Sequence, residues 1–223
     1  MELKIGHRGA MGYEPENTLL SFKKALDLQV DAIELDVHLC KTGEVVVIHD
    51  DTVDRTTNGK GYVAEKTFSE LRLLDAGKGQ KIPALQEVFD LIKRKIKINI
   101  ELKGRETAKP VSEIIEKYVR GKGWSYDDFF VSSFNHHELL EFSKLKPEIK
   151  IGLVTTNASL DLAVKIKAHS VNVRYDVVNE DFVSTAHKKR LMVFAWTVNN
   201  SKDIKRIKSY GVDGIFSDFP DRL

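Results

Sequence analysis

The chain of 223 residues lacks several features that mark whole classes of protein. Its single cysteine, Cys40, excludes an internal disulfide framework and a zinc site built from several cysteines. No apolar run reaches the ~18 residues that a membrane-spanning helix needs. The first residues, Met-Glu-Leu-Lys-Ile-Gly-His, have no apolar stretch of signal-peptide length. We therefore expect a cytoplasmic protein whose cysteine stays reduced and which has no stable membrane insertion.

Net charge is also nearly absent. The chain has 35 Lys and Arg against 33 Asp and Glu, a formal charge of +2. So weak a field does not recruit nucleic acid or anionic lipid, and we expect neither as a partner. An apolar content of 42% is enough for one well-buried core. The oligomeric state is left open.

Several well-known motifs are missing as well. There is no G-x-G-x-x-G dinucleotide turn, no P-loop and no G-x-S-x-G elbow. His137-Glu138 lacks the second histidine of a metalloprotease helix. The acidic run 50–54 is followed by Arg55, where a calcium loop needs glycine. These absences exclude a Rossmann or P-loop nucleotide site, a serine hydrolase of the G-x-S-x-G type, a metalloprotease of this helix type and an EF-hand calcium loop.

What the chain does have is a regular alternation of strand and helix patterns. Short connections between such elements require parallel strands, and eight units predict an α/β fold of the (β/α)8, or TIM, barrel type. The predicted strands are 3–6, 32–37, 97–102, 129–133, 150–154, 170–174, 192–197 and 214–217. The predicted helices are 17–28, 84–94, 108–120, 135–145, 159–167, 179–188 and 201–209. Predicted N-caps are Asn17, Asn135, Asn179 and Ser201.

One segment breaks the alternation, between the second and third barrel strands. Residues 43–83 are about twice what one crossover needs, and they include a strand-like run at 44–48 and a short helix at 69–74. Segments of this length are more often functional than incidental. We predict one domain over residues 1–223, with a small inserted subdomain at about 43–83 that covers one mouth of the barrel.

Acidic residues alternate with apolar ones in two neighbouring predicted strands. Because side chains alternate between faces, Glu34 and Asp36 share one face of the second strand, and Asn99, Glu101 and Lys103 share one face of the third. The apolar faces pack on helices, so the carboxylates point into the barrel. Three unpaired carboxylates would repel at high desolvation cost. An all-oxygen set favours one hard divalent cation, Mg²⁺ or Ca²⁺, with Mn²⁺ as an alternative.

Two histidines and two cationic residues complete the candidate site. His7 and His49 each end an apolar run, and two imidazoles near a metal can divide acid and base duties. Arg8 offers a planar fork for a phosphate and Lys103 a point charge. By parity His38 shares the acidic face and is expected near the mouth. These groups fit phosphate-ester cleavage best, although Arg8 and Lys103 could instead neutralise the acids as a structural ion network.

Short motifs follow one another along the chain in a fixed order. They are Gly6–Gly9, Pro15–Thr18, Ile33–Val37, Val47–Asp50, Asp54–Gly59, Ile82-Pro83, Glu101–Lys103, Trp196–Asn199 and Gly211–Ile215. Together they resemble the glycerophosphodiester phosphodiesterase family, in the PLC-like phosphodiesterase superfamily. The likeness covers essentially the whole chain.

The resemblance implies a TIM barrel with an inserted subdomain. It implies metal-dependent hydrolysis of glycerophosphodiesters, such as glycerophosphocholine or glycerophosphoethanolamine, to glycerol 3-phosphate and an alcohol. By position, His7 and His49 match the family's acid/base pair. Glu34, Asp36 and Glu101 match its metal ligands.

The same resemblance extends to the substrate contacts. Arg8 and Lys103 match the family's phosphate contacts, and Phe134 and Trp196 match aromatic residues on the glycerol side of its pocket. The chain departs from the commoner family residues outside the proposed chemistry, at Cys40, Thr42 and Arg190.

Three alternatives stay open at this stage. A lysophospholipase D or sphingomyelinase D-like phosphodiesterase would need an apolar entrance, whereas residues 50–61 are polar. A non-catalytic phosphate-binding barrel would usually have lost a ligand or a histidine. An aldolase-like barrel would use Lys103 for a Schiff base, which nearby Glu101 disfavours. The sequence also leaves open which histidine is the base, and whether the glycerol 2-hydroxyl or water attacks phosphorus.

Overall fold

The structure, a computed structural model, describes residues 2–223. Eight parallel strands close into a barrel in the order β1-β2-β4-β5-β6-β7-β8-β9, because β1 pairs with both β2 and β9. β3 pairs antiparallel with β2 at the edge. The strands are β1 Leu3–Gly6, β2 Ala32–Leu39, β3 Val45–Val47, β4 Lys97–Leu102, β5 Phe129–Ser133, β6 Lys150–Thr155, β7 Ser170–Arg174, β8 Met192–Trp196 and β9 Gly214–Ser217. The predicted TIM barrel is confirmed.

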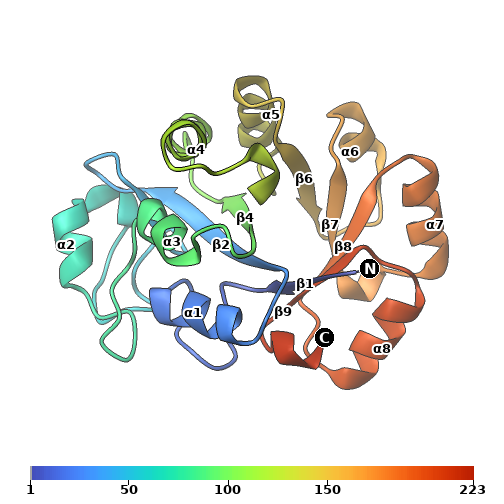
Figure 1. Cartoon of the computed structure of the whole chain (residues 1–223), viewed down its shortest axis with the longest axis horizontal. Coiled ribbons are helices and arrows are strands. Elements are labelled where there is room, and N and C mark those ends of the chain that lie inside the picture. Colours follow the sequence, from blue (N-terminus) through green and yellow to red (C-terminus); the bar gives the residue numbers. More distant parts are fainter. Residues whose placement is uncertain (1) are drawn as a thin grey trace.

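Helices surround the ring of strands, and α2 lies at one edge of the molecule, away from the ring (Figure 1). All predicted helices are present, although most are a few residues shorter than expected. The α-helices are α1 Leu19–Asp27, α2 Phe68–Leu73, α3 Leu85–Ile92, α4 Ala108–Gly121, α5 His136–Leu145, α6 Asp161–Lys165, α7 Glu180–Lys188 and α8 Ser201–Ser209. Short 3-10 helices occupy η1 Val63–Glu65, η2 Tyr126–Asp128, η3 Tyr175–Val177 and η4 Pro220–Arg222. Within residues 2–223, no helix combines the length and apolarity needed to cross a bilayer.

The apolar faces of strands and helices meet outside the barrel. Ile33, Leu35 and Val37 of β2 are fully buried there, as the alternating pattern predicts. Phe89 of α3 lies at the centre of an aromatic group, 5.0–5.3 Å from the ring centroids of its three aromatic neighbours, which are Tyr118, Trp124 and Phe129. This layer leaves the inner face of β2 free to carry polar side chains.

The predicted insertion at about 43–83, called the excursion from here on, follows β2 and has its own small core. β3 pairs with the end of β2, with Val47 opposite Val37. Beyond β3 the chain packs around a separate cluster of buried apolar residues: Cys40, Val46, Ile48, Val53, Val63, Leu71, Ala76 and Ile82. The expected extra strand and short helix are both present. The domain division, one domain with an insertion at about 43–83, stays a prediction.

Two of the four predicted N-caps are wrong. Thr18, not Asn17, caps α1, because its backbone is extended and its side chain accepts from the Ser21 N–H. Asn17 has a φ of 55°, and its side chain is committed to a partner described below. Asn200, not Ser201, caps α8. The other two predicted caps are confirmed, Asn135 and Asn179.

The aromatic group under α3 gives a test of the outer core. Phe89→Ala should lower the free energy of unfolding by about 3–5 kcal/mol, because it removes a fully buried ring and leaves a cavity. Urea denaturation measures this difference. Leu73→Ala is the control, since Leu73 is 79% exposed and should change stability by less than about 0.5 kcal/mol. A similar small change for Phe89→Ala would contradict the packing described here.

Candidate active site

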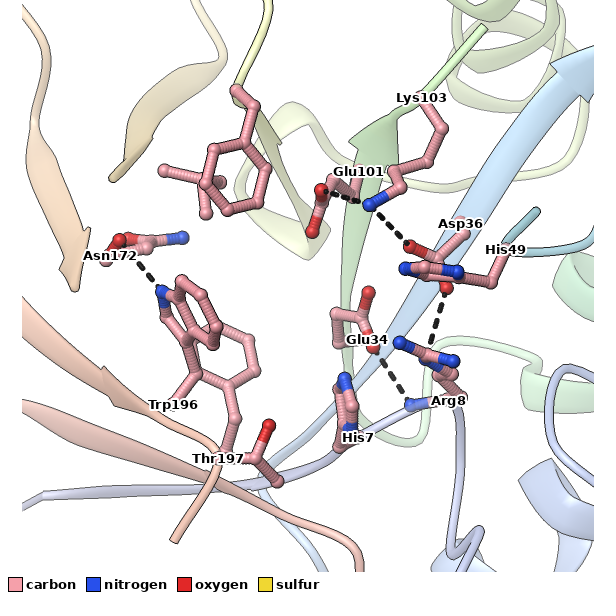
Figure 2. A pocket seen from close by; sticks show the side chains of 13 residues that line it. His7, Arg8, Glu34, Asp36, His49, Glu101, Lys103, Asn172, Trp196 and Thr197 are labelled. Atoms are coloured by element: carbon pink, nitrogen blue, oxygen red, sulfur yellow. Dashed lines mark hydrogen bonds and ion pairs between the residues drawn. The ribbon is translucent and has the colours of Figure 1, made fainter. Parts of the chain in front are cut away.

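A pocket of about 470 Å³ is lined by residues at the carboxyl ends of the barrel strands and in the loops that follow them. All nine side chains predicted from the sequence line it, and Figure 2 shows them from close by. They are His7, Arg8, Glu34, Asp36, His49, Glu101, Lys103, Phe134 and Trp196. Four further lining residues were not predicted: Val154, Asn172, Thr197 and Phe216. Val154 and Asn172 had a usable signal, because strand parity directs both into the barrel.

The loop after β1 folds tightly onto helix α1 and positions the first two site residues. Gly9 has a φ of 85°, and a Cβ on it would come within 2.4 Å of the Ser21 hydroxyl. Arg8 also lies in the left-handed region, at φ 49°. This turn directs the Arg8 backbone N–H at Glu34 Oε2, at 2.8 Å. The first loop thus contacts the acidic residues of β2 through its backbone.

The three predicted carboxylates lie together where β2 and β4 pair. Asp36 stands opposite Glu101 in the register, and one oxygen from each of Glu34, Asp36 and Glu101 lies within 4.8 Å of the others. Burial, reinforced by the charges of the other two carboxylates, raises the pKa of Glu34 well above its usual value. Burial and Asp36 also raise the pKa of Glu101. Such a cluster is costly to keep ionised, and its all-oxygen donor set suits a hard cation.

Side-chain cations neutralise this cluster only in part. Lys103 Nζ lies 3.1 Å from Glu101 and 4.0 Å from Asp36, and Arg8 Nε lies 3.4 Å from Asp36. The ion network considered from the sequence therefore forms. Among the described residues, however, Glu34 has no salt bridge, and three carboxylates against two cations leave one negative charge over. The residues present fit a divalent cation.

Lys103 remains charged in this environment. Burial disfavours its ammonium form, but Glu101 and Asp36 outweigh burial and raise the pKa of Lys103 above its usual value. A protonated amine is a poor nucleophile, which argues against the aldolase-like alternative.

Each predicted catalytic histidine has one ring nitrogen held by a carboxylate. His7 Nδ1 lies 2.6 Å from Asp218 Oδ1, and His49 Nδ1 lies 2.6 Å from Asp50 Oδ1. Burial would favour the protonated form of Asp218, yet the hydrogen bond from His7 keeps its pKa below the usual value. Burial lowers the pKa of His49 and so favours its neutral ring. In both histidines Nε2 is left for a reacting group.

A chain of ion pairs ties the second histidine to the first loop. Arg55 contacts Asp50 at 2.7 Å through Nε and Glu16 at 2.7 Å through Nη1. Glu16 also accepts from Arg8 Nη1 at 2.7 Å. The hydrogen bond from Arg55 is the main reason that the pKa of Asp50 is strongly lowered. The excursion thus supplies both His49 and the charges that orient it.

Two polar residues have roles that strand and helix patterns did not predict. His38 does not line the pocket as parity suggested, because its Nε2 donates to the His49 carbonyl at 3.0 Å. Asn17 reaches the carboxylate cluster instead of capping a helix. Its Nδ2 donates to Asp36 Oδ2 at 2.9 Å, and its Oδ1 accepts from the Asp36 N–H at 3.3 Å. His38 thus holds the backbone of His49, and Asn17 holds the carboxylate of Asp36.

The opposite half of the pocket is aromatic. Phe134 and Trp196 meet edge to face with ring centroids 5.7 Å apart, and Lys103 Nζ lies 5.5 Å from the Phe134 ring centroid. Trp196 donates through Nε1 to the backbone carbonyl of Asn172 at 2.9 Å. One wall of the pocket is therefore apolar, and the facing wall carries the charges (Figure 2).

Reacting groups in TIM barrels stand at the carboxyl ends of the strands, and the side chains here obey that rule. The fold and the pocket thus define a TIM barrel with two histidines beside a carboxylate cluster at the carboxyl ends of its strands, an arrangement suited to acid/base chemistry. The model of the glycerophosphoryl diester phosphodiesterase family matches residues 7–222, and the chain belongs to that family.

Individual relatives match this chain over nearly its full length and over nearly their own. A glycerophosphodiester phosphodiesterase from Caldanaerobacter subterraneus is 40% identical, over 99% of this chain and 96% of its own. A phosphodiesterase structure from Oleispira antarctica, in complex with the product sn-glycerol-3-phosphate, has a TM-score of 0.89 and 29% identity, covering 98% and 93% of the two chains. A Thermotoga maritima glycerophosphodiester phosphodiesterase has a TM-score of 0.83 and 30% identity, covering 99% and 96%.

The carboxylate cluster predicts how stability changes with pH. A carboxyl group whose pKa is raised by folding binds more protons when folded, so its contribution favours the folded state at low pH and is lost as pH rises through its folded pKa. Chelator-treated protein should therefore become less stable as pH rises above the ordinary carboxyl range. Mg²⁺ or Ca²⁺ should restore stability, more so at higher pH, because the ligands must be deprotonated.

Thermal unfolding across pH, with chelator or cation, measures this effect. Glu34→Gln should weaken both the pH dependence and the cation effect. The exposed Glu113→Gln should change neither. A melting temperature of chelated protein that rises with pH above the carboxyl range, with no response to either cation, would refute the cluster's assignment as a cation site.

Proposed function

We propose that this protein hydrolyses glycerophosphodiesters, such as glycerophosphocholine and glycerophosphoethanolamine, to glycerol 3-phosphate and an alcohol. The observation that carries the proposal is one pocket in which two histidines, each bonded to a carboxylate, stand beside a cluster of two buried carboxylates and one partly buried carboxylate. The product complex of the Oleispira antarctica relative supports a small phosphate-bearing substrate. The location we propose is the cytoplasm.

Glu34, Asp36 and Glu101 would hold one divalent cation, and we propose Mg²⁺ or Ca²⁺, with Mn²⁺ as an alternative. When bound, such an ion lowers the pKa of a coordinated hydroxyl and offsets negative charge on a phosphate. Glu34 and Asp36 are buried and Glu101 is partly buried, and all three line the pocket.

Arg8 and Lys103 would bind the phosphate. Arg8 presents a fixed guanidinium beside Asp36, and Lys103 stands between Glu101 and Asp36. Both side chains are already oriented by carboxylates before substrate arrives, so little rotational freedom is lost on binding. Phe134 and Trp196 would enclose the glycerol carbons.

His7 and His49 would move the protons. The neutral ring of one accepts the proton of the attacking hydroxyl, from water or from the glycerol 2-hydroxyl, while a new P–O bond forms. In the second case the product of this step is a cyclic phosphate, which water then opens to glycerol phosphate. The protonated ring of the other delivers a proton to the departing alkoxide as the old P–O bond breaks. The lowered pKa of His49 favours that residue as the acceptor. Asp50 and Asp218 would fix the orientation of the two rings toward the substrate.

The proposal predicts release of glycerol 3-phosphate from a panel of glycerophosphodiesters. Release should stop with chelator and return when Mg²⁺, Ca²⁺ or Mn²⁺ is added back, since the carboxylates provide a site for such an ion. An enzymatic assay for glycerol 3-phosphate makes the measurement. If no diester is hydrolysed with any of the three ions, the proposed function is disproved, which leaves a phosphodiesterase of acylated lipids or a non-catalytic phosphate-binding barrel.

The acid/base assignment predicts the effect of removing either histidine. His7→Ala and His49→Ala should each lower kcat by at least ~10², because each abolishes one proton transfer. The exposed His137→Ala is a matched control and should retain normal turnover. Near-normal turnover in either pocket variant, with the fold verified by circular dichroism, would disprove its catalytic role.

A further inference from the structure

One polar side chain stands in the apolar half of the pocket without a use in the chemistry above. Asn172 is 1% exposed, and its Nδ2 has no hydrogen-bond partner within residues 2–223. Val154 stands opposite it in the register of β6 and β7, and Trp196 and Phe216 also line the pocket. Figure 2 shows the amide directed toward the centre of the pocket, across from the carboxylates. It is a buried polar group that faces the space available to a ligand.

The surrounding chain holds this amide in one orientation. The Ser170 hydroxyl donates to Asn172 Oδ1 at 2.9 Å, which leaves Nδ2 directed away from Ser170. Trp196 donates to the Asn172 backbone carbonyl. On the neighbouring strand Gly152 makes room, because a Cβ there would come within 3.0 Å of Oδ1 and 3.2 Å of Nδ2. The donor is thus preorganised before any ligand arrives.

A buried N–H without a partner costs folding free energy, and native proteins rarely leave one unpaired. A ligand that supplies an acceptor would remove that cost on binding. The charged half of the pocket already attracts the phosphate through Arg8 and Lys103. The part of the substrate that reaches the apolar half is then uncharged, short and able to accept a hydrogen bond.

We propose that Asn172 Nδ2 donates to the terminal hydroxyl of the glycerol, and that this contact selects deacylated glycerophosphodiesters over lysophospholipids. The inference rests on the proposed function. In a lysophospholipid that oxygen carries an acyl chain, which a wall built from Val154, Trp196 and Phe216 would have to accommodate. A substrate without the hydroxyl would leave the buried amide unpaired, which sites of this kind reject strongly.

The test compares glycerophosphocholine with an analogue whose terminal hydroxyl is replaced by hydrogen, 2-hydroxypropyl phosphocholine, in the metal-loaded enzyme. Wild type should favour glycerophosphocholine by ~10² or more in kcat/KM. Asn172→Ala should lose ~10-fold or more on glycerophosphocholine, mainly through a higher KM, and little on the analogue. Its relative activity on lysophosphatidylcholine should rise.

Val154→Ala is the matched control, because it alters the same wall without removing a donor. It should affect both substrates by similar factors. Equal losses on both substrates in Asn172→Ala, or no loss on either, would overturn the assignment while the proposed function stands. Absence of hydrolysis by wild type on every diester would overturn the proposed function, and this inference with it. Circular dichroism and the melting temperature confirm that each variant is folded.

Discussion

Three carboxylates that lie side by side where β2 and β4 pair, two of them buried and one partly buried, are the constraint on which the site depends. Their mutual repulsion and desolvation oppose folding, so the surrounding structure has to compensate. Compensation comes from the Arg8 backbone, from the Asn17 amide and from Lys103. One negative charge is still left over, which is why the cluster suits a hard cation.

The histidines depend on that arrangement through a second set of charges. Asp218, after the last barrel strand, holds His7 near the first, which is a consequence of barrel closure. Arg55, in the excursion, holds Asp50 and Glu16 and so joins His49 to the loop that carries Arg8. The excursion therefore supplies a pocket-lining histidine as well as the charges that orient it.

Much of this could be predicted from the sequence because local patterns carry the necessary information. Alternation of polar and apolar residues placed Glu34, Asp36 and Glu101 inside the barrel, and strand–helix spacing predicted the fold. Failures occurred where a tertiary contact competes with a local rule. Asn17 has a good capping side chain, yet its amide pairs with Asp36 instead. His38 has inward parity, yet its ring turns to the His49 carbonyl.

The sequence by itself determined the barrel and the inward carboxylates through periodicity, and short motifs indicated His7, Arg8, His49 and Lys103. Phe134 and Trp196 came only from the family resemblance. Only the tertiary structure decided which groups orient the pocket side chains, such as Asp218 for His7 or Ser170 for Asn172. Those contacts are set by how the strands close and by where Gly152 leaves space, and a side-chain hydrogen bond forms only over a short distance that no linear pattern encodes.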